Sequence, residues 1–181
     1  KKLSKLNRSF AKALVELGNC MRGIKIRLAS QSDAKILLPF IRAEILHASH
    51  YNVQSRRVYA SEITEARLRD VVLNRGVLIA AFEGGAPVAC MWATFDSEDK
   101  SIMWIDWMLV ERLHRHKGIG RSMLRFFERC ARSMKVRKVW CDSRASNYQA
   151  IGLYRSERFR MVGILKRHWF GQDYLLWEKT L

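Results

Sequence analysis

The chemistry of this chain starts from a short basic stretch, MLVERLHRHKGIGRSML, in which an apolar run gives way to a glycine turn and then to a helical pattern. Gly118 and Gly120 carry no Cβ atom, so a ligand can approach their backbone closely. The first N–H groups of a helix have no partner within that helix, and the helix dipole favours an anion there. With the charges of Arg115, Lys117 and Arg121, the turn predicts a phosphate-binding site.

Two common phosphate-binding loops do not fit this stretch. A Walker A loop requires GxxxxGK[ST], which the chain lacks, and the dinucleotide fingerprint GxGxxG requires glycine at the position of Met123. A plain tight turn with a solvated basic rim remains the structural alternative to a phosphate site.

A second candidate for chemistry is Asp106, the lone charge in the apolar segment SIMWIDWMLV. The segment is mainly apolar on both faces, which favours a central strand covered on both sides. A buried carboxylate without a partner is costly, so Asp106 must have a partner, reach solvent or act in catalysis. In a regular strand Trp104 and Met108 share its face, and they could line a pocket for an acceptor substrate.

The elements that position these residues indicate a single α/β domain. The 181 residues are 49% hydrophobic, which is enough for one sizeable core. Helices are expected over about residues 1–19, 32–48, 61–75, 118–134 and 147–156. Strands are expected in IKIRLAS, VLIAAFE, APVACMWATF, SIMWIDWMLV, KVWCDSR, RMVGILKRHWF and QDYLLWEKTL. The core stripe of the fourth helix is expected to be Leu124, Phe127, Ala131 and Met134.

Composition narrows the class of partner. The chain carries 33 Lys+Arg against 17 Asp+Glu, a net charge of +16, which predicts an anionic partner without choosing among nucleic acid, cofactor phosphates and acidic lipid. The cysteines at 20, 90, 130 and 141 form no CxxC pair, so reduced thiols in a cytoplasmic protein are expected. No apolar run approaches the ~18 residues that a transmembrane helix needs. His47 and His50 lack an evident third ligand and are interpreted as solvated helix residues rather than as a metal site.

A further segment, VWCDSRASNYQAIGLYRSERF, consists of a strand that ends in an acidic residue, then RASN, then a helix carrying AIGLY and an aromatic residue. Together with RHKGIG and Val110 upstream of it, this segment resembles the GNAT superfamily of N-acetyltransferases. Its RASNxxAIxLY form is most similar to the branch of ribosomal-protein alanine and other protein N-terminal acetyltransferases. The resemblance covers residues 24–181, with its motifs in 109–159. It implies a mixed, mostly antiparallel sheet of about six to seven strands, flanked by helices, whose central strands splay apart.

The resemblance also implies roles for residues. Asp142 matches the family's catalytic acidic residue, usually Glu, and is expected to act as general base through water because its side chain is one methylene shorter. Tyr154 matches the family's tyrosine and is expected to protonate the CoA thiolate, since a phenol pKa near ~10 suits a thiol near ~8.5. Asp106 ranks second as base. The residues expected to bind acetyl-CoA are Leu109, Val110, Arg115, His116, Lys117, Gly118, Ile119, Gly120, Arg121, Asn147 and Tyr154.

Some of these positions also have plainer explanations. Asp142 can pair with Arg144 or Arg137 at the end of its strand, and Tyr154 can be a core tyrosine with a satisfied hydroxyl. Asn147 is expected to cap the following helix in either case.

The chain departs from the family pattern at two places. Arg158 replaces the glycine that normally precedes the aromatic residue, so a left-handed helix end there would be strained by about 1 kcal/mol. The turn VERLHR lacks the family's usual proline, which bears on local geometry alone.

These features predict transfer of an acetyl group from acetyl-CoA to a primary amine, with a protein or peptide N-terminal α-amine favoured by the resemblance. Direct attack in a ternary complex is expected, because no cysteine or serine is paired with a histidine as a nucleophile would be. No metal is expected. The alternatives are a lysine side chain, a polyamine or an aminoglycoside as acceptor, and a non-catalytic regulatory module that binds CoA or RNA.

Residues 1–23 are predicted to be an N-terminal extension outside the acyl-CoA N-acyltransferase domain of residues 24–181. Leu3, Leu6 and Phe10 recur on one stripe of a basic helical pattern. Such a helix packs on the domain or a neighbouring subunit, or it docks on an anionic surface such as RNA, a ribosome or a membrane.

Overall fold

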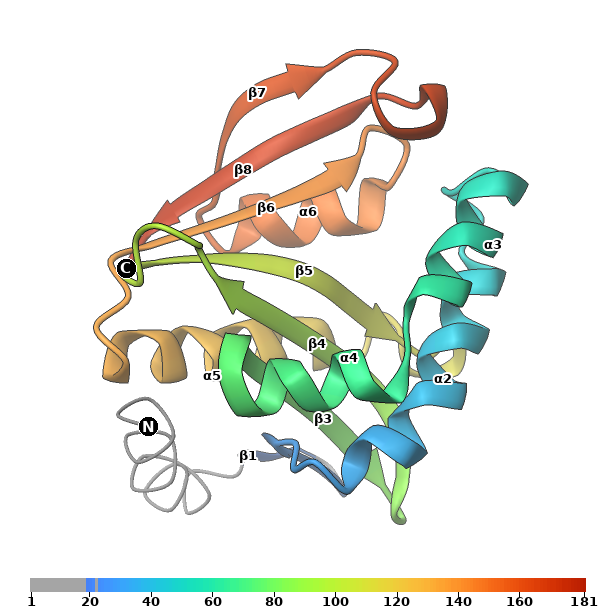
Figure 1. Cartoon of the computed structure of the whole chain (residues 1–181), viewed down its shortest axis with the longest axis vertical. Helices are drawn as coiled ribbons and strands as arrows, with labels where there is room; N and C mark the ends of the chain where they lie inside the picture. Colours follow the sequence, from blue (N-terminus) through green and yellow to red (C-terminus); the bar gives the residue numbers. More distant parts are fainter. Residues whose placement is uncertain (1–18, 22) are drawn as a thin grey trace.

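The computed structural model describes residues 19–21 and 23–181. They form one sheet of eight strands in the order β1-β2-β3-β4-β5-β6-β8-β7, with helices packed against it (Figure 1). β5 and β6 run parallel and the other neighbouring pairs of these residues are antiparallel, which confirms the expected mixed sheet. The strands are β1 (Asn19–Met21), β2 (Ile24–Leu28), β3 (Gly76–Glu83), β4 (Ala86–Phe95), β5 (Ile102–Val110), β6 (Lys138–Arg144), β7 (Arg160–Leu165) and β8 (Tyr174–Thr180).

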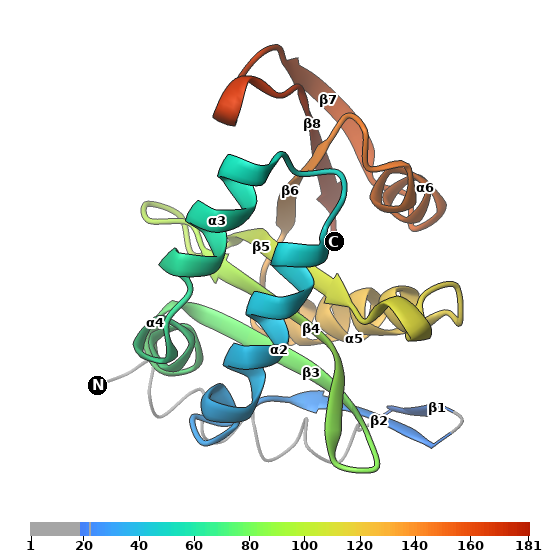
Figure 2. The same ribbon diagram turned by 90° about the vertical axis from the view of Figure 1, so that its right-hand side faces the viewer.

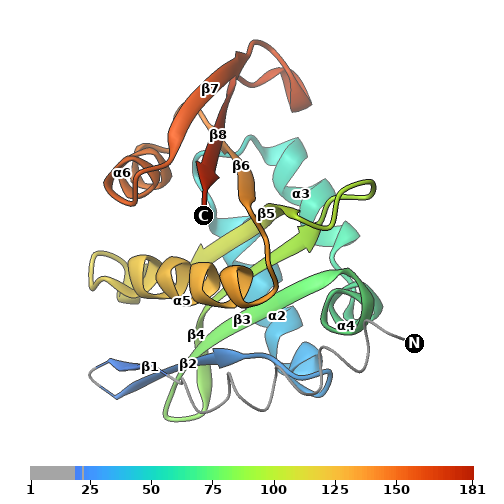
Figure 3. The ribbon, with the colours of Figure 1, turned by 90° about the vertical axis from the view of Figure 1, so that its left-hand side faces the viewer.

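The helices cover the two faces of the sheet in separate groups. Figure 2 shows α2, α3 and α4 on one face, and Figure 3 shows α5 and α6 on the other. Short 3₁₀ or π turns, named η1 to η3, complete the list. The bounds are α2 (Asp33–His47), α3 (Val53–Glu62), α4 (Glu65–Asp70), η1 (Val71–Arg75), η2 (Arg112–His114), α5 (Ile119–Ser133), α6 (Tyr148–Ser156) and η3 (Trp169–Gly171).

A short strand precedes residue 24 at the edge of the sheet. Asn19–Met21 pair with β2 as this strand, β1. The helix predicted over residues 1–19, and with it the proposed anionic docking surface, lies outside the described residues except for Asn19. No described helix is long and apolar enough to cross a membrane.

The segment between residues 48 and 76 departs most from the sequence prediction. The helix expected over residues 61–75 is instead α4 followed by the π turn η1, and it begins after Thr64, whose hydroxyl accepts from Arg67 N at 3.2 Å. α3 was not expected. It buries the small side chains of Ser55 and Ala60, so no stripe of large apolar residues announces it in the sequence.

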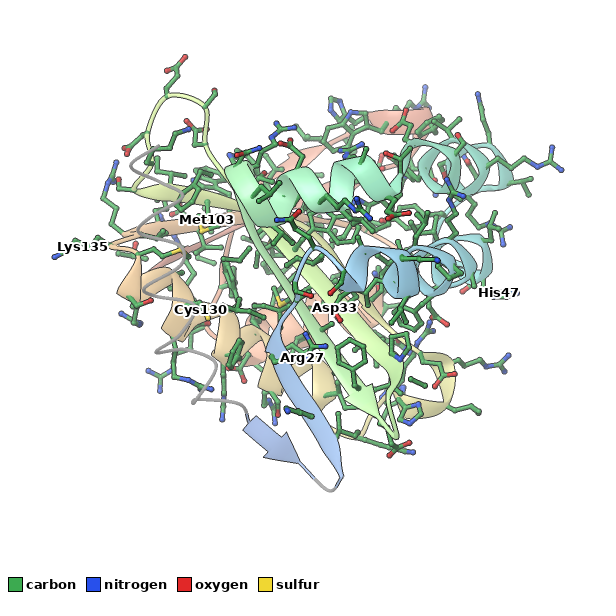
Figure 4. The ribbon with its side chains drawn as sticks, turned by 60° about the horizontal axis from the view of Figure 1, so that its bottom comes forward. Arg27, Asp33, His47, Met103, Cys130 and Lys135 are labelled. Atoms are coloured by element: carbon green, nitrogen blue, oxygen red, sulfur yellow. The ribbon has the colours of Figure 1, made fainter. Side chains whose placement is uncertain are left out.

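An ion pair joins the end of β2 to the start of α2. Arg27 donates to both Asp33 carboxylate oxygens at 2.8 Å, and Ser30 N donates to one of them at 2.6 Å. The two side chains point toward one another in Figure 4. Ser32 is the N-cap residue of α2, but its side chain makes no capping hydrogen bond.

Each face of the sheet has its own core. Leu124, Phe127 and Ala131 of α5 are fully buried, and Met134 packs at the margin, which confirms the predicted stripe. On the opposite face α2 packs its apolar residues, including Leu37, against the sheet. The central position predicted for SIMWIDWMLV is confirmed, because β5 lies between β4 and β6. Cores on both faces hold the central strands firmly where they are paired.

Candidate active site

The candidate active site lies where the two central strands separate. β5 and β6 pair from Ile102 to Ile105 of β5. Beyond Ile105, β5 stays paired with β4 as far as Val110, and β6 stays paired with β8 as far as Arg144. The strands therefore diverge, as Figure 1 shows on the side near α3. The expected splaying of the central strands is confirmed.

A β-bulge in β5 lies at the point of separation. Trp92 of β4 is opposite Trp107 and Ala93 is opposite Ile105, so Asp106 has no partner in this register. A bulge bends its strand, increases the twist and locally disrupts pairing. It also changes the alternation of side chains: Ile105 packs in the core under α5, whereas Trp107 packs against the core under α2.

The diverging strands enclose a cleft of about 440 Å³. It is lined by the loop between α2 and α3, the second half of β5, the turn before α5, the end of β6, and α6. Its volume lies in the usual range for small-molecule sites. Because the strands part, side chains from both faces of the sheet reach the same space.

The glycine turn forms one end of this cleft. Gly118 is the N-cap of α5 with φ of 83°, a left-handed conformation that glycine adopts without strain. A Cβ on Gly118 would meet nothing within 4 Å, and one on Gly120 would lie 3.4 Å from Leu153 Cδ2. Both glycines line the cleft beside N–H groups that have no partner within the helix. This end of the cleft fits a diphosphate.

The basic residues near the turn differ in how far they are neutralised. Arg115 donates to a backbone carbonyl of β5 at 2.9 Å and pairs with Glu44 at 2.9 Å. Arg121 pairs with Glu157, also at 2.9 Å. Lys117 is exposed and does not line the cleft. Arg115 and Arg121 therefore link the turn to neighbouring elements in addition to placing positive charge beside it.

Apart from Lys117, the residues predicted to bind acetyl-CoA come together around the cleft. They belong to the end of β5, the turn before α5, and the start of α6. The ones that line it are Leu109, Val110, Arg115, His116, Gly118, Ile119, Gly120, Arg121, Asn147 and Tyr154.

Asp142 is the first residue of β6 beyond the paired part and lines the cleft. Burial raises its pKa to about 6; the positive charge of Arg144 lowers it and the negative charge of Asp106 raises it. In the described part of the chain no ion pair reaches this carboxylate, and Arg137 instead pairs with Asp99 at 2.9 Å. A carboxylate with this pKa is largely charged at neutral pH and is basic enough to accept a proton.

Tyr154 of α6 belongs to the core under α5 and also lines the cleft. Its side chain is 5% exposed and packs against Phe159 and Trp177. Burial, followed by the effects of the adjacent Cys141, raises the pKa of its hydroxyl well above the usual value. The hydroxyl is therefore protonated at neutral pH, as a general acid must be, but it is a weaker acid than a free tyrosine.

Residues 42–158, more than half of the chain, match the model of the acetyltransferase (GNAT) family. The chain belongs to the GNAT acetyltransferase family. It is an N-acetyltransferase with acetyl-CoA as co-substrate, and the glycine end of its cleft has the character that a CoA diphosphate requires. No curated protein matches the sequence.

Solved structures share the fold of this acetyltransferase. A GNAT-family acetyltransferase from Streptococcus pneumoniae is 18% identical with a TM-score of 0.76, covering 87% of this chain and 99% of that one. The PaiA N-acetyltransferase of Thermoplasma acidophilum, in complex with coenzyme A, is 15% identical with a TM-score of 0.75 and coverages of 87% and 99%. A ribosomal-protein-alanine N-acetyltransferase from Brucella melitensis is 23% identical with a TM-score of 0.66 and coverages of 86% and 99%.

Asp106 of the acetyltransferase also lines the cleft, where its side chain is exposed. The surrounding protein raises its pKa by desolvation, although hydrogen bonds from Thr94 and the charges of Arg67 and Arg75 oppose the shift. Met108 lines the cleft as suggested, but Trp104 does not; it stacks on Trp140 at 5.5 Å where β5 and β6 are paired. The regular alternation assumed from the sequence fails because of the bulge.

His50 is a cleft residue that the sequence interpretation missed. It lies in the loop after α2, whereas His47 is exposed on the last turn of α2 (Figure 4). Burial, then the charges of Arg115 and Arg144, lowers the pKa of His50 to about 4. Its imidazole is therefore neutral at physiological pH. No local pattern in HASHYN distinguishes this histidine from a solvated one.

The orientation of Asn147 defines the tautomer of His50. Asn147 Oδ1 accepts from Ala150 N at 3.2 Å, so Asn147 caps α6 as expected. Its Nδ2 therefore faces His50 Nε2, at 3.3 Å, and donates to it. The ring proton of His50 is then on Nδ1.

Among the described residues, no group of three or more histidine, cysteine, aspartate or glutamate side chains could hold a metal ion.

Proposed function

We propose that this acetyltransferase acts on the α-amino group at the N-terminus of a protein or peptide. The observation that carries the proposal is the position of Asp142, unpaired and with a pKa of about 6, where the splayed strands bring it into one cleft with Tyr154. An α-amino group with a pKa near ~8 is a closer match to such a base than a lysine side chain near ~10.4. The RASN segment supports the same choice, since it resembles N-terminal acetyltransferases.

Asp142 is the general base in this proposal. Because Cys141 packs in the core under α5, the next side chain along β6 faces the side of α2 and α3. There Asp142 removes a proton from the acceptor ammonium through a water molecule. The neutral amine can then attack a thioester, which its protonated form cannot.

Tyr154 is the general acid, and the glycine turn positions the co-substrate. Acetyl-CoA supplies the activated acetyl thioester. The N–H groups near Gly118 and Gly120 hold its diphosphate, while Leu109 and Val110 hold its thioester arm along the free edge of β5. Tyr154 remains protonated in its buried position and gives its proton to the sulfur that leaves.

Transfer is direct, without an acyl-enzyme intermediate. Cys141 lies beside the cleft, but burial raises its pKa well above the ordinary value and keeps it a thiol. Cys90 and Cys130 are buried as well, and burial raises the pKa of each thiol. A thiol in this state is a poor nucleophile.

The test is thiol release from acetyl-CoA with matched acceptors. The panel contains peptides with free N-termini, the same peptides with blocked N-termini and one lysine, polyamines and an aminoglycoside. We expect turnover with free N-termini and a fall to background when they are blocked. Turnover that persists on the blocked lysine peptides, or that occurs with polyamines alone, would contradict the proposed acceptor.

A further inference from the structure

Arg144 is a buried cation whose hydrogen bonds are incomplete. It lies on β6 two residues beyond Asp142, on the same face of the strand, and is 1% exposed. Its Nη1 donates to Trp169 O at 2.9 Å. Its Nε and Nη2 have no hydrogen-bond partner among the described residues. Buried donors without a partner are rare in folded proteins, so this pair requires an explanation.

Two tyrosine rings cover the faces of the Arg144 guanidinium. Its Cζ lies 4.7 Å from the centroid of the Tyr51 ring and 4.0 Å from that of Tyr174. This stacking leaves the edges of the guanidinium for hydrogen bonding. Since Nη1 is engaged by Trp169, the free edge is the one that carries Nε and Nη2. Its two parallel N–H groups can bind an oxygen acceptor together.

Arg125 of α5 shows the same edge in an occupied state. Its Nε donates to Glu157 Oε2 at 2.9 Å and its Nη2 donates to Oε1 at 3.1 Å. The Arg125 side chain is 60% exposed, so water can replace that carboxylate. Arg144 is buried, and an empty edge is more costly there. The contrast indicates that the Arg144 edge needs a partner that no described residue supplies.

Arg144 is one of the residues that line the acceptor side of the candidate active site. Arg144 lines the cleft together with Asp142, Asp106 and Tyr51. We propose that Nε and Nη2 of Arg144 bind the carbonyl oxygen next to the acceptor amine, so that the enzyme recognises an α-aminoacyl group. This inference rests on the proposed function and names the first carbonyl of the N-terminal residue as the feature that is recognised.

The charges near the proposed contact include both signs. The guanidinium of Arg144 attracts an anionic group, whereas Asp106 and Asp142, which also line the cleft, repel it. A neutral carbonyl accepts the same hydrogen bonds without that repulsion. A lysine side chain or a polyamine has no oxygen next to its amine and would leave the Arg144 edge empty. A site built around a hydrogen bond discriminates strongly against an analogue that lacks the partner.

The first test uses the wild-type enzyme and three small acceptors: alaninamide, alanine and 2-aminopropane. They share the carbon that carries the amine and differ in having a neutral carbonyl, a carboxylate or neither. We measure kcat/KM for each, corrected to the concentration of unprotonated amine. We expect alaninamide to exceed 2-aminopropane by about 10- to 100-fold, the worth of hydrogen bonds to a charged donor, with alanine below alaninamide.

The second test uses Arg144→Lys, which keeps the charge but lacks the two-pronged edge, with Arg125→Lys as the matched control outside the cleft. We expect Arg144→Lys to lower kcat/KM for alaninamide by about 10- to 100-fold and that for 2-aminopropane by less than about 3-fold. Arg125→Lys is expected to preserve the preference for alaninamide. Calorimetric CoA binding and the thermal unfolding midpoint report whether each variant is folded.

The outcomes separate this inference from the proposed function. Equal falls for alaninamide and 2-aminopropane in Arg144→Lys would assign the free edge to an ordered water or to stability and would overturn the inference alone. Equal kcat/KM of the wild-type enzyme for alaninamide and 2-aminopropane would also overturn the inference alone. This test does not depend on the folding of the variant. Failure on alaninamide together with turnover on blocked lysine peptides would overturn the proposed function as well.

Discussion

The two ends of the cleft are built in different ways. The end proposed to bind the cofactor is formed largely by one continuous segment, from Leu109 through the glycine turn to Arg121, and the groups proposed to bind there are mainly backbone N–H groups. The end proposed to bind the acceptor is assembled from side chains that are far apart in the chain, such as His50, Asp106 and Arg144. A backbone site depends on local conformation, whereas a side-chain site depends on which strands become neighbours. The two ends should therefore respond to different substitutions.

Replacement of Asp142 by Asn is expected to have the largest effect, lowering kcat without changing the affinity for CoA. The variant cannot accept the proton of the ammonium group, so kcat should fall by about 10²- to 10⁴-fold. The dissociation constant for CoA, measured by calorimetry, should stay within about 2-fold, because no backbone N–H group of the turn is altered. Asp70→Asn on α4, outside the cleft, is the control. Weakened CoA binding in Asp142→Asn would show that the two ends are not separate.

Gly120→Ala is the corresponding change at the cofactor end. The new Cβ would lie 3.4 Å from Leu153 Cδ2 and 3.9 Å from Val110 Cγ2, which are ordinary contacts, so the protein should fold normally. The methyl group should nevertheless hinder approach to the first N–H groups of α5 and raise the KM for acetyl-CoA by about 10-fold. The KM for the acceptor should not change. Steady-state kinetics with each substrate varied in turn distinguishes the two constants.

Asp106→Asn tests which carboxylate is the base, through the pH profile. The base must be unprotonated, so kcat/KM should be full above a pKa of about 6 and fall as the pH drops through it. Removing the negative charge of Asp106 lowers the pKa of Asp142, so the acid limb should move to lower pH while activity at pH 8 is retained. The other charged groups that shift Asp142 and Asp106, namely Arg144, Arg67 and Arg75, are unchanged. Loss of activity at every pH would instead make Asp106 the base.

Arg158→Gly is expected to have the smallest effect and to leave both ends intact. Arg158 follows α6 with φ of 65°, so α6 does end in a left-handed residue, the condition under which strain was expected. Glycine should relieve about 1 kcal/mol of strain, which corresponds to a rise of about 2–4 °C in the unfolding midpoint. Arg155→Gly, inside α6, should lower the midpoint by a similar amount. Thermal unfolding followed by circular dichroism checks both, and a fall in the Arg158→Gly midpoint would contradict the strain argument.

The sequence predicted most strands and the longer helices because their apolar periods are clear. α3 was not predicted, because its buried residues are small. The helix expected over residues 61–75 was wrong in two respects: it starts later, and its second half is a π turn. β1 was not expected, since three residues are too few to show the alternating pattern of a strand. The mixed character of the sheet was predicted correctly.

At the candidate site the local features were predicted, and the resemblance also predicted the splayed strands. The glycine turn before α5 and the Asn147 cap follow from neighbouring residues and were visible in the sequence. The roles expected for Asp142, Tyr154 and Asp106 stay predictions that the variants above test. His50 and Tyr51 could not be placed, because nothing near them indicates that their loop borders the splayed strands.

By itself the sequence determined the glycine turn and the elements that flank it, and it supplied the residues that are proposed as phosphate site, base and acid. These depend on backbone conformation and on chemistry within a few residues. The tertiary structure decided that Asp106 lies in a bulge, that Asp142 has no ion-pair partner among the described residues, and that Arg144 is buried between Tyr51 and Tyr174 with one edge free. The physical reason is that pKa values, burial and unpaired donors are set by the neighbours that packing brings together, which no local pattern encodes.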